Sequence, residues 1–478
     1  MAILKLALGS LTLAGALCAQ GPEPARFLRL NVVATDNRGE PAGDLKAEDF
    51  RVTDDGKPQR ISLFRGGGSG MPAPVQGGRE FFNRAASPHA TAILFDFLNE
   101  TRTDLLEASR KMGQSLKGLE SGESLYFYLL LMDGKLLPIH GIEKAPGDAP
   151  DKTWVQDIEA LLAKAVKTQA GTRPAGMLQE EVVKRTYVGL ETLAKQMAAL
   201  PGRREIVWVT NGVPSVTNPK TPCSGDWIDC ALYVPHLSVT LDSAGAVVNP
   251  FSYSSLLGPD TTRTMEEMAG LTGGRTYFSE DMRTVVTQLA GAASGVYSLA
   301  YEPPREDWDN KFHKVKVTCE RKGVKIQARQ RYYGLPDTRS AAVRQQAALV
   351  AAYQSPSDIS YIGLRAALSP GADPQKTVRV EMRVDPADLL LEDRGGTWEG
   401  QITVLFSART AAGPKGEPTL ANLALHLTKE QRETAAKEGI PIAREYAIDN
   451  TIEKVRLIVL DLGADSVGSL TMPYVPGK

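Results

Sequence analysis

Three short apolar runs in the middle of the chain constrain its fold more than any other feature. They cover residues 92–95, 125–131 and 206–209, and the first and last are followed directly by polar residues. Strands that are apolar on both faces belong to sheets covered on both sides. Segments with helical spacing of apolar residues alternate with these runs. This alternation predicts an α/β domain with a doubly wound parallel sheet over residues 88–295.

The stretches on either side of this region have strand patterns instead. Residues 27–64 and 296–334 alternate apolar and polar positions, as half-buried strands do, and both are predicted to be all-β. A Gly- and Pro-rich stretch at 65–88 is predicted to be a mobile linker or loop. Residues 340–374 are predicted to form a helical linker, and residues 375–478 a C-terminal β-sandwich.

Composition narrows the classes of function. Lys and Arg number 55 and Asp and Glu 56, so the formal charge is −1 and a nucleic-acid or anionic-membrane surface is not expected. The five His and four Cys are scattered, which argues against a His/Cys zinc site or a thiol enzyme. The sequence has neither a Gly-x-Ser-x-Gly elbow nor a phosphate-binding Gly-x-x-x-x-Gly-Lys motif. These features favour a non-enzymatic module without a cofactor.

The first residues indicate export. One Lys precedes an apolar run at residues 6–19, which is typical of a secretory signal peptide spanning residues 1–19 and cleaved after Ala19. Cys18 offers a lipoprotein alternative, but Leu17 before it fits that pattern poorly. No later segment is long and apolar enough to cross a bilayer. The mature chain is therefore expected in the periplasm or outside the cell.

Export would place the remaining cysteines in a compartment where disulfides can form. Cys223 and Cys230 lie close together in a Pro-, Gly- and Ser-rich stretch, and a disulfide between them is expected in an oxidising compartment. The alternative is two unpaired thiols in a loop. Cys319 falls on the apolar side of an alternating strand and is expected in a core.

Several motifs, taken in order, resemble one family. They include 30–36 (Leu-Asn-Val-Val-Ala-Thr-Asp), 96–99 (Asp-Phe-Leu-Asn), 200–204 (Leu-Pro-Gly-Arg-Arg) and 271–275 (Leu-Thr-Gly-Gly-Arg). Together they resemble secreted bacterial proteins, abundant in acidobacteria, that carry a von Willebrand factor type A-related domain. The likeness covers roughly residues 27–334.

The resemblance implies a specific architecture. A doubly wound type A domain would be inserted in a β-sandwich built from 27–64 and 296–334, and an Ig-like β-sandwich would follow. Ligands of such domains bind at the carboxyl ends of the strands.

The resemblance also implies a magnesium site, in a degenerate form. Adhesive type A domains hold Mg²⁺ through Asp-x-Ser-x-Ser, a Thr and a later Asp. Here Asp96 matches, whereas Leu98 and Glu100 replace the two Ser, and Asn211 replaces the later Asp. Thr186 is the nearest candidate for the Thr. Oxygen ligands of this kind suit Mg²⁺, but Leu98 cannot ligate.

A second reading of the same residues needs no metal. Asp96 and Asn99 would cap the following helix or bind local backbone groups, as Asx residues do after strands. Thr186 would simply lie within a long helix. We favour this reading, with Mg²⁺ as the alternative.

The stretch 213–260 completes the candidate binding face. It shows no clear secondary structure in the sequence, and long loops of this kind are often functional. It follows the strand that ends near Asn211, so it is expected at the carboxyl edge of the sheet. Its aromatic residues, together with Asn99, are candidate partner-binding residues, since Trp and Tyr are enriched in binding hot spots. They are Trp227, Tyr233, Phe251 and Tyr253. The alternative is that these aromatic side chains cover the domain's own core.

These observations predict an exported binding or adhesion-type module for a protein or cell-envelope partner, acting through the carboxyl-end face. One alternative is a structural envelope or assembly component. Another is a hydrolase that uses carboxylates of the same face.

Overall fold

The computed structural model describes most of the chain after the N-terminal segment. The described residues are 26–66, 80–83, 89–117, 124–142, 154–169, 179–198, 200, 203–212, 227–254, 257–292, 295–355, 358–373, 376–411, 413–449 and 451–474. The expected signal peptide at 1–19 lies outside these residues. None of the helices described is both long and apolar enough to span a membrane.

A six-stranded sheet in the order β11-β10-β9-β6-β7-β8 forms the centre of the α/β domain. Its strands are β6 (His89–Asp96), β7 (Leu125–Leu130), β8 (Leu136–His140), β9 (Arg203–Val209), β10 (Ala246–Ser252) and β11 (Tyr277–Phe278). All neighbours pair in parallel except β7 and β8, which are antiparallel. The sheet is therefore mixed rather than purely parallel. The reason is the tight turn at Gly134, which allows a hairpin but no crossover.

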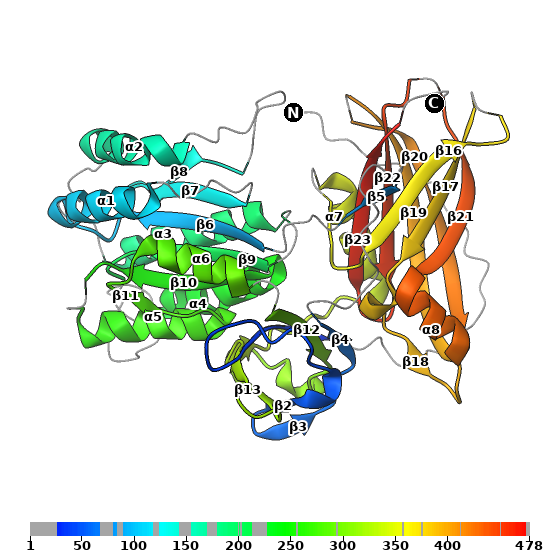
Figure 1. The fold of residues 1–478 in the computed structure, drawn as a ribbon, viewed down its shortest axis with the longest axis horizontal. Coiled ribbons are helices and arrows are strands. Elements are labelled where there is room, and N and C mark those ends of the chain that lie inside the picture. Colours follow the sequence, from blue (N-terminus) through cyan, green and yellow to red (C-terminus); the bar gives the residue numbers. More distant parts are fainter. Residues whose placement is uncertain are drawn as a thin grey trace.

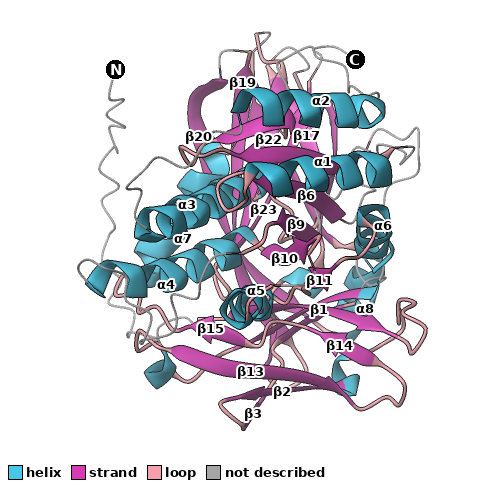
Figure 2. Cartoon of the chain, turned by 90° about the vertical axis from the view of Figure 1, so that its left-hand side faces the viewer, coloured by secondary structure: helices cyan, strands magenta, loops and turns pink. Residues whose placement is uncertain are grey.

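Helices cover both faces of this sheet (Figures 1 and 2). One layer contains α1 (Arg102–Leu116), α2 (Trp154–Gln169) and α6 (Met282–Ala292), and the other contains α3 (Gln179–Met197), α4 (Trp227–Ala244) and α5 (Pro259–Thr272). Strand β6 shows why both layers are needed. Ile93 and Phe95 pack into the first, Ala92 and Leu94 into the second, and all four are fully buried.

The expectation of an unstructured loop over 213–260 is wrong. Helix α4 and strand β10 lie within it, and β10 is an interior strand between β9 and β11. Two prolines hide these elements in the sequence, because Pro235 lies inside the helix and Pro250 inside the strand. All seven residues of β10 are buried, so much of this stretch belongs to the domain core.

The Gly-Gly pair after α5 shows how one of the quoted motifs determines structure. Gly273 ends the helix with φ of +82°, a left-handed conformation that favours glycine. A side chain on Gly274 would meet the carbonyl oxygen of Val248, because the two backbones lie in close contact there. Both glycines therefore allow the chain to turn tightly from α5 toward β11.

The first β unit combines segments from before and after the α/β domain. Its strands are β1 (Leu28–Thr35), β2 (Phe50–Asp54), β3 (Lys57–Gln59), β4 (Leu63–Arg65), β12 (Val296–Tyr301), β13 (Phe312–Cys319), β14 (Lys325–Gln327) and β15 (Arg331–Tyr333). They form two four-stranded sheets, β14-β1-β12-β4 and β15-β13-β2-β3. Strand β1 pairs with β12 and β2 with β13, so the chain leaves this unit and returns to it.

Both sheets of this first unit contribute to one core, which includes Leu30, Phe50, Tyr297 and Tyr332. Cys319 is only half-buried at the edge of this core, not fully buried as expected, and it is a free thiol.

The C-terminal unit contains two antiparallel sheets that enclose a single core. Its elements are α7 (Ala341–Gln354), β16 (Leu364–Pro370), β17 (Thr377–Val384), β18 (Glu392–Asp393), β19 (Trp398–Thr410), β20 (Gly413–Leu427), α8 (Lys429–Glu438), β21 (Ile440–Ala447), β22 (Lys454–Asp461) and β23 (Ser466–Pro473). The boundary at 375 is too late, because β16 pairs along its whole length with β17. The expected linker 340–374 thus contributes both a helix and a strand of this unit.

The stretch 65–88 also contributes to the C-terminal unit. Strand β5 (Glu80–Phe82) lies within it and pairs with β16 at the sheet edge. The Asn83 side chain donates to the carbonyls of Ile359 (2.9 Å) and Ile362 (2.8 Å) and accepts from the Leu364 backbone N–H (2.8 Å). The chain between β4 and β6 is therefore attached to a unit that lies far away in the sequence.

Substitution of Asn83 by alanine is expected to weaken this attachment by about 1–2 kcal/mol, because buried backbone groups lose their partners. Hydrogen exchange of the β16 amides is expected to accelerate by roughly tenfold, since 1.4 kcal/mol corresponds to a factor of ten. The exposed Asn37→Ala variant serves as the control. Equal exchange of β16 in both variants would show that Asn83 does not hold β5 in place.

Candidate functional site

Asp96 lies at the carboxyl end of β6 and is completely buried. Its carboxylate accepts five hydrogen bonds. They come from the backbone N–H groups of Leu98 (3.0 Å) and Asn99 (3.1 Å) and from Asn99 Nδ2 (2.6 Å), Trp208 Nε1 (3.0 Å) and Thr210 Oγ1 (3.0 Å). Thr101, and neither Asp96 nor Asn99, caps helix α1. Asp96 therefore fixes the loop after β6 and joins it to the end of β9.

Asn99 connects this carboxylate to α3. Its amide nitrogen lies 2.6 Å from Asp96 Oδ2 and 2.8 Å from Thr186 Oγ1. Thr186 is fully buried within α3 and donates to the carbonyl of Val182. An N–H donor from the protein thus joins the carboxylate and the hydroxyl that the resemblance assigns to a cation.

Glu100 and Asn211 meet at the same end of the sheet. Asn211 Nδ2 donates to Glu100 Oε2, and Asn211 Oδ1 accepts from Ser252 Oγ at 3.1 Å. The four residues predicted for a metal site thus lie in one neighbourhood. Trp208, Thr210 and Ser252 also belong to it, and the sequence reasoning missed them. Their position could have identified them, because each lies at or next to the end of a central strand.

The electrostatics of this network disfavour negative charge. Burial raises the pKa of Glu100 to about 9, the Asp96 carboxylate adds to this shift, and a hydrogen bond from the Asn211 backbone opposes it. Glu100 is therefore protonated at neutral pH. Burial also raises the pKa of Asp96, against the opposing effect of its hydrogen-bond donors. The N–H and O–H groups around Asp96 all donate to it, and such donors stabilise an ionised carboxylate.

These residues fit Mg²⁺ poorly. Mg²⁺ needs charged oxygen ligands in a near-ideal octahedron. Both Asp96 oxygens accept bonds from protein donors, Glu100 is neutral at pH 7, and Leu98 has no ligand atom. Protein hydrogen bonds already link Asp96 to Thr186 through Asn99, and Glu100 to Ser252 through Asn211.

The aromatic candidates separate into different groups. The prediction that Phe251 binds a partner is wrong, because Phe251 is fully buried in the core as part of the interior strand β10. Tyr233 is half-buried and packs against the other core layer. The Trp227 side chain and the expected Cys223–Cys230 disulfide lie outside the residues whose side chains the structure describes. Tyr253 lines a cavity, which we call the Tyr253 pocket.

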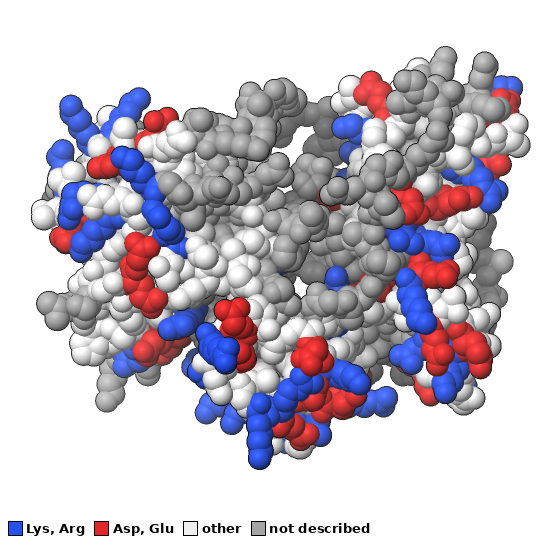
Figure 3. All heavy atoms as spheres, viewed as in Figure 1, with Lys and Arg blue, Asp and Glu red and all other residues white. Residues whose placement is uncertain are grey.

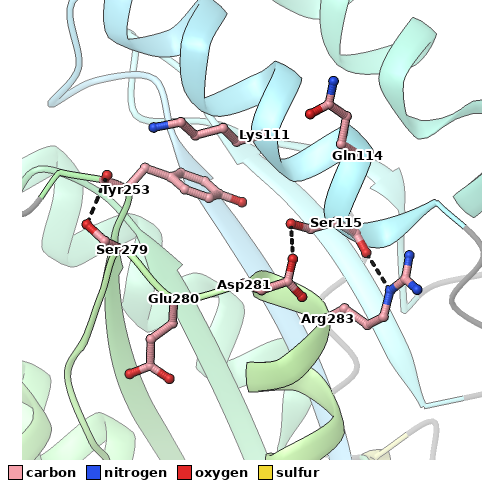
Figure 4. Close-up of a pocket in the computed structure, with 8 residues that line it drawn as sticks. All are labelled: Lys111, Gln114, Ser115, Tyr253, Ser279, Glu280, Asp281 and Arg283. Carbon is pink, nitrogen blue, oxygen red and sulfur yellow. Dashed lines mark hydrogen bonds between the residues drawn. The ribbon is translucent and has the colours of Figure 1, made fainter.

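The Tyr253 pocket has a volume of about 550 Å³ and lies beyond the carboxyl ends of β10 and β11 (Figure 4). Its lining comes from α1, from the residues after these strands and from the start of α6. The residues are Lys111, Gln114, Ser115, Tyr253, Ser279, Glu280, Asp281 and Arg283. The position agrees with the rule that α/β sheets bind ligands outside the carboxyl ends of their strands.

Hydrogen bonds fix one wall of this pocket. Ser115 Oγ donates to Asp281 Oδ2 at 2.8 Å, and Arg283 Nε donates to the Ser115 carbonyl at 2.8 Å. The Tyr253 hydroxyl is buried and has no hydrogen-bond partner among the described residues. Burial raises its pKa, so the hydroxyl remains protonated. The pocket thus offers a polar lining beside an aromatic side chain.

Known proteins offer little guidance. No family model matches the chain, and no curated protein matches it. Among solved structures, the manganese-loaded TRAP protein of Plasmodium vivax is 11% identical with a TM-score of 0.26, covering 52% of this chain and 97% of that chain.

Two further structures are similarly distant. Human COPII-coat protein Sec24c is 10% identical with a TM-score of 0.24, covering 82% of this chain and 44% of that chain. Three N-terminal domains of the type V pilus tip protein Mfa5 of Porphyromonas gingivalis are 8% identical with a TM-score of 0.23, covering 96% and 79%. These values assign neither a family nor a function.

Proposed function

We propose that this chain is an exported, non-enzymatic binding module of the adhesion type. Its α/β domain, the type A-like domain that the sequence resembles, is inserted in the first β unit. It recognises a protein or cell-envelope partner through the carboxyl-end face of the sheet. Recognition uses protein contacts and needs no bound Mg²⁺.

The observation that carries this proposal is the hydrogen-bond network of Asp96. Five donors occupy the carboxylate, and Asn99 links it to Thr186. A carboxylate used in this way holds the loop after β6 in one conformation. It supports a preorganised surface rather than a metal-bridged contact.

The Tyr253 pocket supplies the contact itself. It brings an aromatic ring, cationic and acidic side chains and hydroxyl groups together at the carboxyl-end face. Such a mixed lining suits a polar peptide segment, since protein interfaces combine aromatic anchors with a polar rim. Figure 3 views the molecule from the side, and among the described residues of that view Lys and Arg side chains lie interspersed with Asp and Glu side chains.

The same geometry disfavours the hydrolase alternative. A general base must be ionised and able to reach a substrate proton. Asp96 is buried beneath its donors, and Glu100 is protonated at neutral pH and bound to Asn211. We therefore propose a binding role for this face.

Site-specific photocrosslinking to cell-envelope extracts tests the proposal. A photoreactive residue at Ser279, in the pocket, is expected to capture one discrete partner band. The matched probe at Thr192, an exposed position on α3, is expected to capture none. A Tyr253→Ala variant carrying the Ser279 probe is expected to lower the yield at least tenfold. Equal capture from both positions would refute recognition through this face.

A further inference from the structure

A second cluster of polar side chains lies in the first β unit, away from the Tyr253 pocket. Asp54 ends β2, Asp55 follows in the turn to β3, and His313 lies on the neighbouring strand β13. One carboxylate oxygen from each Asp and one imidazole nitrogen lie within 4.8 Å of one another. His313 and Asp54 are buried, whereas Asp55 is exposed.

The imidazole of His313 is held in one orientation from both sides. Its Nε2 lies 3.0 Å from Asp309 Oδ1, and its Nδ1 lies 2.9 Å from Asp55 Oδ2. The other Asp309 oxygen, Oδ2, accepts from Lys311 Nζ at 2.6 Å, so this carboxylate is itself held in place. Each ring nitrogen thus faces a carboxylate oxygen, and a cation bound at Nδ1 would replace the proton that Nδ1 shares with Asp55 Oδ2 while Nε2–H donates to Asp309. A carboxylate that orients an imidazole in this way is typical of metal-bound histidines.

Asp54 provides the second, independent observation. Only 1% of this residue is exposed. Its Oδ2 accepts from the hydroxyls of Tyr301 (2.6 Å) and Tyr332 (2.9 Å). Its Oδ1 is buried and has no hydrogen-bond partner among the described residues. Burying a charged acceptor without a partner is costly, so this oxygen needs a donor or a cation.

We propose that Asp54, Asp55 and His313 form a binding site for a divalent transition metal ion of the Zn²⁺ type. Metal–ligand distances of about 2.0–2.1 Å place tetrahedral ligand atoms about 3.3 Å apart, so the three atoms, now within 4.8 Å of one another, would close in around such an ion. Asp309 would orient the His313 ring through Nε2, and the Tyr301 and Tyr332 hydroxyls would orient the Asp54 carboxylate. The exposed side at Asp55 leaves room for a water molecule as the fourth ligand.

The donor set selects the class of metal. An imidazole nitrogen with carboxylate oxygens suits Zn²⁺, whereas Mg²⁺ and Ca²⁺ prefer oxygen ligands alone. The site would join the β2–β3 turn to β13 and thus strengthen the first β unit. It is independent of partner recognition at the Tyr253 pocket.

Calorimetric titration of the full chain with Zn²⁺ tests this assignment. The protein is first stripped of metal and its thiols are blocked, so that cysteines do not bind Zn²⁺. One equivalent is expected to bind, and excess Mg²⁺ is not expected to displace it. His313→Gln and Asp55→Asn are expected to abolish this equivalent. Asp309→Asn is expected to lower the affinity by roughly 10–100-fold, the usual effect of losing a group that orients a metal ligand.

Two controls separate loss of the metal site from loss of folding. His426→Gln removes an exposed histidine of the C-terminal unit and is expected to leave Zn²⁺ binding unchanged. Asp55 is exposed, so Asp55→Asn is expected to fold as the parent does, which circular dichroism checks. Failure of the intact chain to bind Zn²⁺, or equal loss in the His426 and His313 variants, would overturn the assignment.

Discussion

Replacement of Asp96 by alanine is expected to destabilise the α/β domain by about 3–5 kcal/mol. The substitution strands buried donors, among them Trp208 Nε1 and the Thr210 hydroxyl. Each unsatisfied buried donor costs about 1–3 kcal/mol, and losses beyond 4 kcal/mol mark disrupted buried networks of this kind. Hydrogen exchange of the β6 and β9 amides measures the effect within this domain, independently of the β units.

Two further variants define the origin of this loss. Asp96→Asn keeps one acceptor oxygen and is expected to cost less than the alanine variant. Asp133→Ala removes an exposed turn carboxylate and is expected to change stability by no more than about 0.5 kcal/mol. If Asp96→Ala exchanged no faster than Asp133→Ala, the network would not be structural.

Replacement of Glu100 by glutamine is expected to stabilise the domain by about 3 kcal/mol at neutral pH, since pH 7 lies 2.5 units above the ordinary value of 4.5 and each unit is worth about 1.4 kcal/mol. Burial raises the pKa of Glu100 to about 9 from an ordinary value of 4.5. Between these two values the folded state binds a proton that the unfolded state has released. Stability therefore falls as the pH rises through this window. Glutamine keeps an acceptor for Asn211 Nδ2 and carries no charge in either state.

The pH dependence distinguishes this effect from a simple packing change. The stability difference between Glu100→Gln and the parent is expected to be near zero at pH of about 4.5, to grow with pH and to level off above about 9. Chemical denaturation at several pH values, with exchange of the α1 amides as the local readout, measures it. A difference that is constant with pH would show that Glu100 has an ordinary pKa in the folded state.

Local patterns predicted the elements whose apolar spacing is regular. Strands β6, β7 and β9 follow from continuous apolar runs, and helices α1 and α3 from helical spacing. Helix α4 and strand β10 could not be predicted in this way, because Pro235 and Pro250 interrupt their patterns. Strand β5 has three residues in a Gly- and Pro-rich stretch, and it is held by long-range contacts: pairing with β16, packing of Phe81 against the C-terminal core and the Asn83 hydrogen bonds.

The residues of the candidate sites also differ in whether the sequence could predict that they meet. The meeting of Asp96 and Asn211 could be expected, because both follow central strands and carboxyl ends of parallel strands share an edge. Burial of Phe251 could not, since its strand was not recognised. Asp55 and His313 are separated by 258 positions, and only antiparallel pairing of β2 with β13 brings them together.

Titration of Mn²⁺, followed by the electron paramagnetic resonance signal of the free ion, distinguishes a hydrogen-bonded Asp96 from a cation-bound one. A background carrying His313→Gln removes the other candidate site, and Asp96→Asn is compared with its parent there. Superimposable binding curves are predicted, since protein donors occupy both oxygens of Asp96. An equivalent of Mn²⁺ held by the parent and lost in Asp96→Asn would contradict recognition without a metal.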